Sequence, residues 1–150
     1  MYSKDELKLL KKDFWEGFGI YCSNHPVLGK RKSKFMLYNT KMKGVELKFD
    51  ANREGAFVIL ELNNPKEEDR LKRYEQFEKY KAVMEENFPE GLIWDFAYKL
   101  ETGHEVCRIY SQKTGIDIHK RIHWMEFYTF MASEMLKLEK AFRYVKEAVE

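Results

Sequence analysis

The stretch VELKFDANREGAFVILEL, residues Val45–Leu62, decides the fold because it specifies a β-hairpin and its register. In both halves apolar residues recur at every second position, the period typical of a strand with one buried face. One face is wholly apolar only if Val45 lies opposite Leu62 and the chain turns through Asn52–Gly55. The residues of that face are Val45, Leu47, Phe49, Val58, Leu60 and Leu62.

The same register places two carboxylates, those of Glu46 and Glu61, opposite each other on the more polar face of the hairpin. Directly opposed side chains lie about 5 Å apart. Like charges at that separation repel unless a metal ion, a proton or a basic side chain lies between them. The pair is therefore either the start of a functional site or ordinary polarity on a solvated sheet face.

Composition limits the class of protein. Lys and Arg number 27 and Asp and Glu 25, so the chain lacks the strong global charge of a protein that coats nucleic acid. Its 150 residues and 23 aromatic side chains predict a single domain, 1–150, with a substantial core. No apolar run approaches the roughly 18 residues of a membrane span. Two cysteines and a charged N-terminal segment predict a reduced, cytoplasmic protein.

Capping signals and periodicity predict the remaining elements. Ser3 and Glu6 form a capping box at the start of a first helix, and Asn64 with Pro65 is a second helix start. We expect helices over 4–20, from 64 to about 89 and from about 123 onward, and further strands at 35–40, 92–98 and 105–110. The order α-βββ-α-ββ-α predicts an α+β fold in which helices flank a mixed sheet.

The order α-β-β-β-α-β resembles the core of the restriction-endonuclease-like, or PD-(D/E)XK, fold. That family carries one acidic residue early in its second strand, and acid, any residue, lysine in its third. The resemblance makes Glu46, Glu61 and Asn63 the catalytic positions, with Glu46 and Glu61 as ligands of Mg²⁺. Asn63 stands where the family has lysine, and an amide cannot supply that charge. We therefore expect a degenerate site, unless Lys66 or Arg73 replaces the lysine.

The whole chain also resembles a family of short bacterial domains of unknown function, numbered four-two-six-eight. The resemblance rests on aromatic motifs, namely Phe14-Trp15, Phe18-Gly19, Lys48-Phe49-Asp50-Ala51, Tyr74-Glu75-Gln76-Phe77 and Trp124. These motifs are structural and indicate no reaction. Members of the family occur alone or as tails of nuclease-like or restriction-associated proteins, which favours a role with nucleic acid.

A basic loop precedes the hairpin. Six cations fall within fourteen residues, Lys30, Arg31, Lys32, Lys34, Lys41 and Lys43, and Phe35 and Tyr38 lie among them. Phosphate contacts need several mobile cations in one place. The loop is the predicted contact surface for DNA or RNA, and a merely solvated loop is the alternative.

The predicted function is association with nucleic acid by a restriction-endonuclease-like domain whose nuclease site is degenerate or inactive. The alternative is a non-enzymatic domain that binds another protein or forms a homodimer. Nucleic-acid binding requires the loop cations on the same side of the sheet as Glu46 and Glu61. Protein binding requires several hundred Å² of exposed apolar surface there instead.

Overall fold

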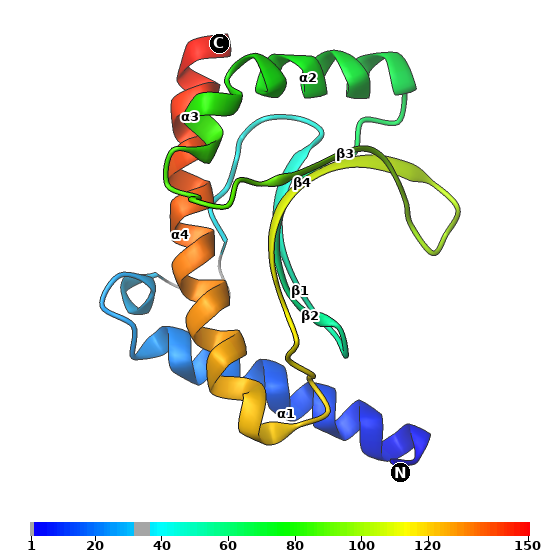
Figure 1. Cartoon of the computed structure of the whole chain (residues 1–150), viewed down its shortest axis with the longest axis vertical. Coiled ribbons are helices and arrows are strands. Elements are labelled where there is room, and N and C mark those ends of the chain that lie inside the picture. Colours follow the sequence, from blue (N-terminus) through cyan, green and yellow to red (C-terminus); the bar gives the residue numbers. More distant parts are fainter. Residues whose placement is uncertain (1, 32–36) are drawn as a thin grey trace.

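The computed structural model describes residues 2–31 and 37–150 (Figure 1). In chain order the elements are α1 (Lys4–Ser23), the 3₁₀ turn η1 (Leu28–Lys30), β1 (Val45–Ala51), β2 (Gly55–Leu62), α2 (Glu67–Lys79), α3 (Lys81–Glu85), β3 (Ile93–Lys99), β4 (Glu105–Thr114), the 3₁₀ turn η2 (Arg121–His123) and α4 (Trp124–Val149). The predicted α+β class is confirmed, as is the capping box of Ser3 and Glu6.

Four strands form one curved sheet in the order β1-β2-β4-β3. Every neighbouring pair is antiparallel, so the prediction of a mixed sheet was wrong. The reason lies in the second hairpin, because β4 rather than β3 joins β2 and β3 becomes the outer edge. The long helix α4 covers one face of the sheet, whereas no helix of the described residues covers the concave face opposite it (Figure 1).

The register of the first hairpin is the predicted one. Val45 pairs with Leu62, Leu47 with Leu60, and Glu46 with Glu61. In the turn, the side chain of Asn52 accepts hydrogen bonds from the backbone N–H groups of Glu54 and Gly55. Gly55 is required here, since a Cβ at its position would lie 2.0 Å from the carbonyl oxygen of Lys113 on β4.

Residues 37–40 form no strand, contrary to prediction, and residues 35 and 36 lie outside the described residues. The segment instead forms hydrogen bonds at the start of β1. The hydroxyl group of Thr40 donates a 2.7 Å hydrogen bond to the carbonyl oxygen of Val45, and the N–H of Met42 donates to the same hydroxyl. Side-chain bonds of this kind give the backbone an alternative to a sheet ladder.

The second predicted helix is shorter and interrupted. α2 begins at Glu67 rather than at Asn64 or Pro65, and its N-terminal cap, Lys66, makes no side-chain capping bond. The carbonyl oxygen of Asn64 accepts a hydrogen bond from the buried Arg70 instead. The helix ends at Lys79, and the short α3 then places Met84 in the core.

The core lies between α4 and the sheet. Leu60 of β2 and Phe127, Met131 and Phe142 of α4 are fully buried. α1 crosses the first half of α4, and the hydroxyl group of Tyr128 donates a 2.7 Å hydrogen bond to a backbone carbonyl in α1. Within the described ranges, no helix is long and apolar enough to cross a membrane.

Candidate functional site

The predicted acidic pair belongs to a polar row that crosses all four strands. Glu46 pairs with Glu61, Glu61 with Arg108, and Arg108 with Asp95. Because side chains alternate between faces and Leu60 and Ile109 face the core, this row lies on the concave face. The sequence placed Glu46 and Glu61 correctly relative to each other but gave no indication of Arg108.

Glu61 is the centre of a hydrogen-bonded cluster, which we call the Glu61 network: Glu46, Lys48, Glu61, Asn63 and Arg108. The Nζ of Lys48 lies 2.7 Å from Glu61 Oε2 and 3.2 Å from Glu46 Oε2. Arg108 donates from Nε at 3.1 Å to Glu61 Oε1, with Nη2 at 3.0 Å. The amide of Asn63 donates to Glu61 Oε2 at 3.3 Å. A basic side chain therefore separates the two carboxylates.

The charges of the network hold each other in place. Only 1% of Glu61 is exposed, and burial alone would raise the pKa of its carboxyl group. Hydrogen bonds and attraction from Lys48 and Arg108 outweigh burial, so the pKa of Glu61 lies below its ordinary value. Burial likewise acts to lower the pKa of Lys48, but its contacts with Glu61 and Glu46 exceed that effect and raise the pKa. Both groups are charged at neutral pH.

This arrangement leaves little room for the metal site predicted at Glu46 and Glu61. Both oxygens of Glu61 already accept hydrogen bonds, and a divalent cation would have to displace Lys48. Across residues 2–31 and 37–150, no three His, Cys, Asp or Glu side chains are grouped as metal ligands. The cations at the site come from Lys48 and Arg108, whereas Arg73, considered as a replacement, donates to Gln76 within α2.

Aromatic side chains border the network on the concave face. The guanidinium group of Arg108 lies 4.1 Å from the ring centroid of Tyr98, and Phe57 packs edge-on against Tyr110. These side chains border a cavity of about 220 Å³ that Asp50 also lines. Four acidic side chains, Glu46, Asp50, Glu61 and Asp95, face two basic ones, Lys48 and Arg108, so this part of the concave face is acidic rather than basic.

The predicted basic loop divides into anchoring and exposed residues. Arg31 pairs with Glu139 of α4, of which only 1% is exposed, and the N–H of Tyr38 donates to the same carboxylate. Arg31 therefore fastens the loop to α4. Lys30, Lys41 and Lys43 are exposed. Two further predicted contacts, Lys32 and Lys34, lie outside the described residues.

Helix α4 adds cations that sequence reasoning missed. The guanidinium group of Arg143 lies 5.4 Å from the ring centroid of Tyr38, and Lys140 precedes it by three residues. We call the exposed cations Lys30, Lys41, Lys43, Lys140 and Arg143 the loop–α4 surface. The loop and α4 lie about 100 residues apart in the sequence, so no local pattern indicated that they are neighbours in space, although both segments are rich in lysine and arginine.

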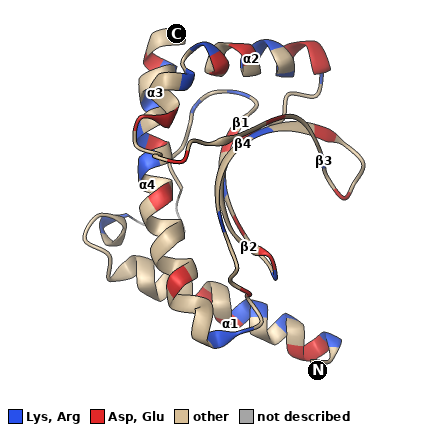
Figure 2. Ribbon diagram, in the orientation of Figure 1, with Lys and Arg blue, Asp and Glu red and all other residues tan. Residues whose placement is uncertain are grey.

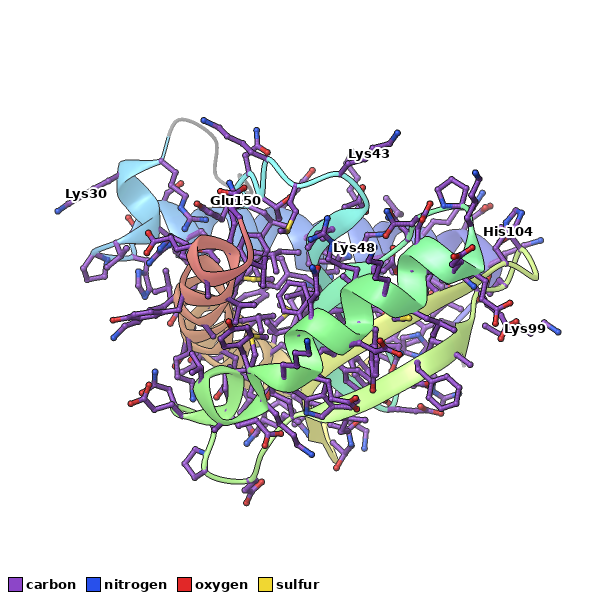
Figure 3. All side chains as sticks on the ribbon, turned by 90° about the horizontal axis from the view of Figure 1, so that it is seen from above. Lys30, Lys43, Lys48, Lys99, His104 and Glu150 are labelled. Carbon is purple, nitrogen blue, oxygen red and sulfur yellow. The ribbon has the colours of Figure 1, made fainter. Side chains whose placement is uncertain are left out.

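The loop–α4 surface is broad and only locally basic. Lys30 and Lys43 point outward and lie well apart (Figure 3). Basic and acidic residues are interspersed along the helices (Figure 2), in agreement with the formal net charge of +2. Because the loop is fastened to α4, which covers the face opposite the Glu61 network, its anchor does not share a side of the sheet with Glu46 and Glu61.

Comparison with known proteins gives one match. The family model described as "Domain of unknown function (DUF4268)" matches residues 10–146, which confirms the family resemblance drawn from the aromatic motifs. No curated protein and no solved structure matches the chain. The restriction-endonuclease-like resemblance stays a prediction.

Proposed function

Since the chain belongs to the DUF4268 family, whose function is unknown, we propose a role from its chemistry: it associates with nucleic acid without cleaving it. The single observation that carries the second half of this proposal is the position of Lys48 between Glu46 and Glu61. The restriction-endonuclease-like resemblance and a cytoplasmic setting are parts of the same proposal.

The expected absence of cleavage follows from the hydrogen bonds that the Glu61 carboxylate already accepts. A nuclease of the restriction-endonuclease-like type needs carboxylates that hold a divalent cation against the phosphate. Here the Glu61 carboxylate is buried and accepts hydrogen bonds from Lys48, Arg108 and Asn63. Its charge stabilises the sheet, and the acidic concave face around it repels a phosphate backbone.

Association with nucleic acid is supported by the loop–α4 surface alone, because the loop is anchored on the side of the sheet opposite Glu46 and Glu61. A shared side is needed for a nuclease-like site, whereas binding without cleavage needs only the cations. Binding without base recognition depends on cations that neutralise phosphates and release counterions. Arg31 contacts Glu139 and Tyr38 lies against Arg143, so the described ends of the loop are held on α4 and the cations of both segments are spread over this side of the molecule. A surface of this kind contacts the backbone and carries no sequence preference.

The test is the salt dependence of binding to a fluorescently labelled 20-base-pair DNA duplex, followed by anisotropy. One variant replaces Lys30, Lys41, Lys43 and Lys140 with glutamine. The matched control replaces Lys4, Lys8, Lys11 and Lys12 of α1 with glutamine. These four side chains are exposed, and their replacement removes the same total charge. Both variants retain the Arg31–Glu139 anchor and Arg143.

Each neutralised phosphate contributes about −0.9 to the slope of log affinity against log salt. The loop–α4 variant should therefore flatten that slope by up to about 3.6, and the α1 control should leave it nearly unchanged. Equal slopes for the two variants would show that net charge, and not the loop–α4 surface, determines the salt dependence of binding, and would contradict the proposal. Undetectable binding of the unmodified protein in low salt would reject the proposal.

A second candidate is a protein-interaction domain, favoured by the outer edge of the sheet. Among the described residues, no strand pairs with the outer edge of β3, and 60% of Phe96 and 37% of Ile93 are exposed on this strand. Edge strands with apolar side chains pair with other chains. If two copies pair there, light scattering should show a dimer that Phe96→Asp converts to a monomer. A monomer at all concentrations would remove this form of the alternative.

A further inference from the structure

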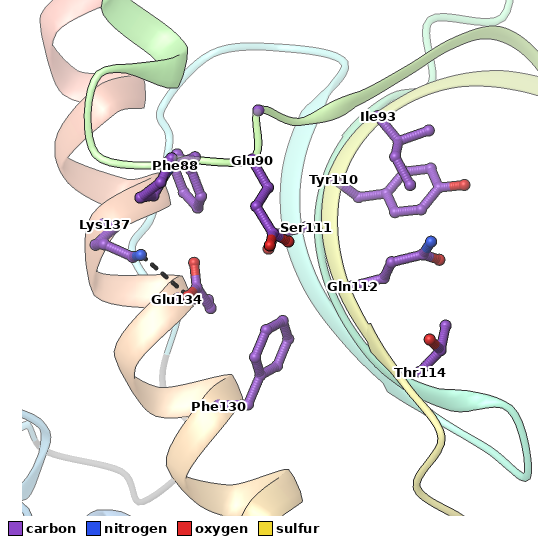
Figure 4. Close-up of a pocket in the computed structure, with 12 residues that line it drawn as sticks. Phe88, Glu90, Ile93, Tyr110, Ser111, Gln112, Thr114, Phe130, Glu134 and Lys137 are labelled. Carbon is purple, nitrogen blue, oxygen red and sulfur yellow. Dashed lines mark ion pairs between the residues drawn. The ribbon is translucent and has the colours of Figure 1, made fainter.

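A cavity of about 520 Å³ separates α4 from the β3–β4 hairpin (Figure 4). Its size falls in the range of about 300 to 1,000 Å³ that is typical of small-molecule sites. It lies between α4 and the part of β4 that extends beyond β3, and Lys137, which lines it, is one helical turn from Lys140 of the loop–α4 surface. The residues that matter for its chemistry are Phe88, Glu90, Ser111, Phe130, Glu134 and Lys137.

Of the two carboxylate oxygens of Glu134, one has an ionic partner and the other has no hydrogen-bond partner among the described residues. Oε1 pairs with Lys137 at 3.0 Å, and only 17% of the Glu134 side chain is exposed. Oε2 is buried and accepts no hydrogen bond from any described residue. Buried polar atoms nearly always have a partner, and an unpaired one is costly. A hydrogen-bond donor bound in the cavity would supply the missing partner, since Glu134 lines it.

The charge around Glu134 favours a cationic donor. Lys137 offsets Glu134, and its Nζ lies 4.8 Å from the ring centroid of Phe88, so it is engaged on both sides. Glu90 extends into the same space from the segment before β3 (Figure 4). The lining therefore has a net charge of −1. The ring of Phe130 projects into the cavity and offers an apolar face to a hydrocarbon chain.

We infer that this cavity binds a small organic amine, specifically a short aliphatic diamine. One ammonium group donates to Oε2 of Glu134, the methylene chain lies along Phe130, and the second ammonium group balances Glu90. This inference does not rest on the nucleic-acid surface proposed above. It goes beyond that role because its ligand is a cation rather than a phosphate.

The binding test is isothermal titration of the full chain with putrescine, butylamine and 1,4-butanediol. Putrescine should bind saturably, butylamine more weakly, and the neutral diol not at all. In nuclear magnetic resonance spectra, putrescine should shift the backbone amide signals of Ser111 and Phe130 in the unmodified protein. No saturable binding of putrescine would overturn the inference, and so would equal binding of the diol.

Variants then separate the site from general ionic attraction. Glu134→Gln should weaken putrescine binding at least ten-fold, and Glu90→Gln should remove the preference for putrescine over butylamine. Glu147→Gln removes the same charge from an exposed position on α4 and should have no effect. An equal loss in Glu147→Gln would overturn the inference. If Glu134→Gln does not fold, the amide signals of Ser111 and Phe130 in the unmodified protein still test the inference, and signals unchanged by putrescine would overturn it.

Discussion

Replacing Glu61 with glutamine should destabilise the fold by about 3 kcal/mol. Removing one member of a buried ion pair costs roughly 3 to 5 kcal/mol, because the remaining charge stays buried without a partner. Arg108 is that charge, with 13% of its side chain exposed. Lys48 is 39% exposed and retains Glu46, so it contributes less to the loss. The cost therefore falls at the lower end of the range.

Glu46→Gln is the matched control, because the chemical change is identical but 53% of the Glu46 side chain is exposed. Exposed ion pairs contribute about 0 to 1 kcal/mol, so a loss in that range is expected. Urea unfolding followed by tryptophan fluorescence measures both, with the free energy taken from the midpoint at constant m-value. The chain carries Trp15, Trp94 and Trp124 as probes.

A metal-ligand role for the pair predicts the opposite sign. Two carboxylates that serve as metal ligands repel each other when the metal is absent, so removing one charge would stabilise the metal-free protein. A loss below about 1 kcal/mol for Glu61→Gln, or an equal loss for Glu46→Gln, would refute the assignment of Glu61 as the centre of a structural network.

Leu60→Ala should lower the free energy of unfolding by about 2 to 5 kcal/mol in the same assay, because Leu60 is fully buried; a loss below about 1 kcal/mol would contradict its place in the core. Gly17→Ala should destabilise by about 1 to 3 kcal/mol, although this change usually stabilises a helix, because the new Cβ would lie 2.3 Å from the hydroxyl oxygen of Tyr128. A raised melting temperature would refute that contact. The depressed pKa of Glu61 means that its contribution to stability is present above pH 4.5 and is lost as the pH falls through the lower, folded-state pKa. Acid unfolding of the unmodified protein should therefore be steeper below pH 4.5 than that of Glu61→Gln, and superimposable acid curves would argue against the effect.

The first hairpin was predictable because its pattern admits only one register. The alternation of Leu47 with the polar Glu46 and Lys48 fixes which face of β1 is buried, and a slip of one residue would expose it. Lys48 could also have been anticipated as the charge between the carboxylates. It follows Glu46 by two residues and therefore shares its face.

Arg108 could not be predicted from local pattern. Its position beside Glu61 depends on β4, rather than β3, joining β2, which is a pairing between segments about 47 residues apart. The helix break at Tyr80 and the loop at 37–40 have the same origin. In both places tertiary contacts override a local preference, since the N–H of Tyr38 donates to Glu139 of α4 and Met84 lies in the core.

The most direct test of the account combines binding and cleavage on one labelled DNA duplex, incubated with the protein and Mg²⁺ or Mn²⁺ in low salt. Half of each sample is run on a native gel and half on a denaturing gel. We expect a shifted band on the native gel and intact strands on the denaturing gel. Metal-dependent strand cleavage by the unmodified protein that disappears in Glu61→Gln would contradict it.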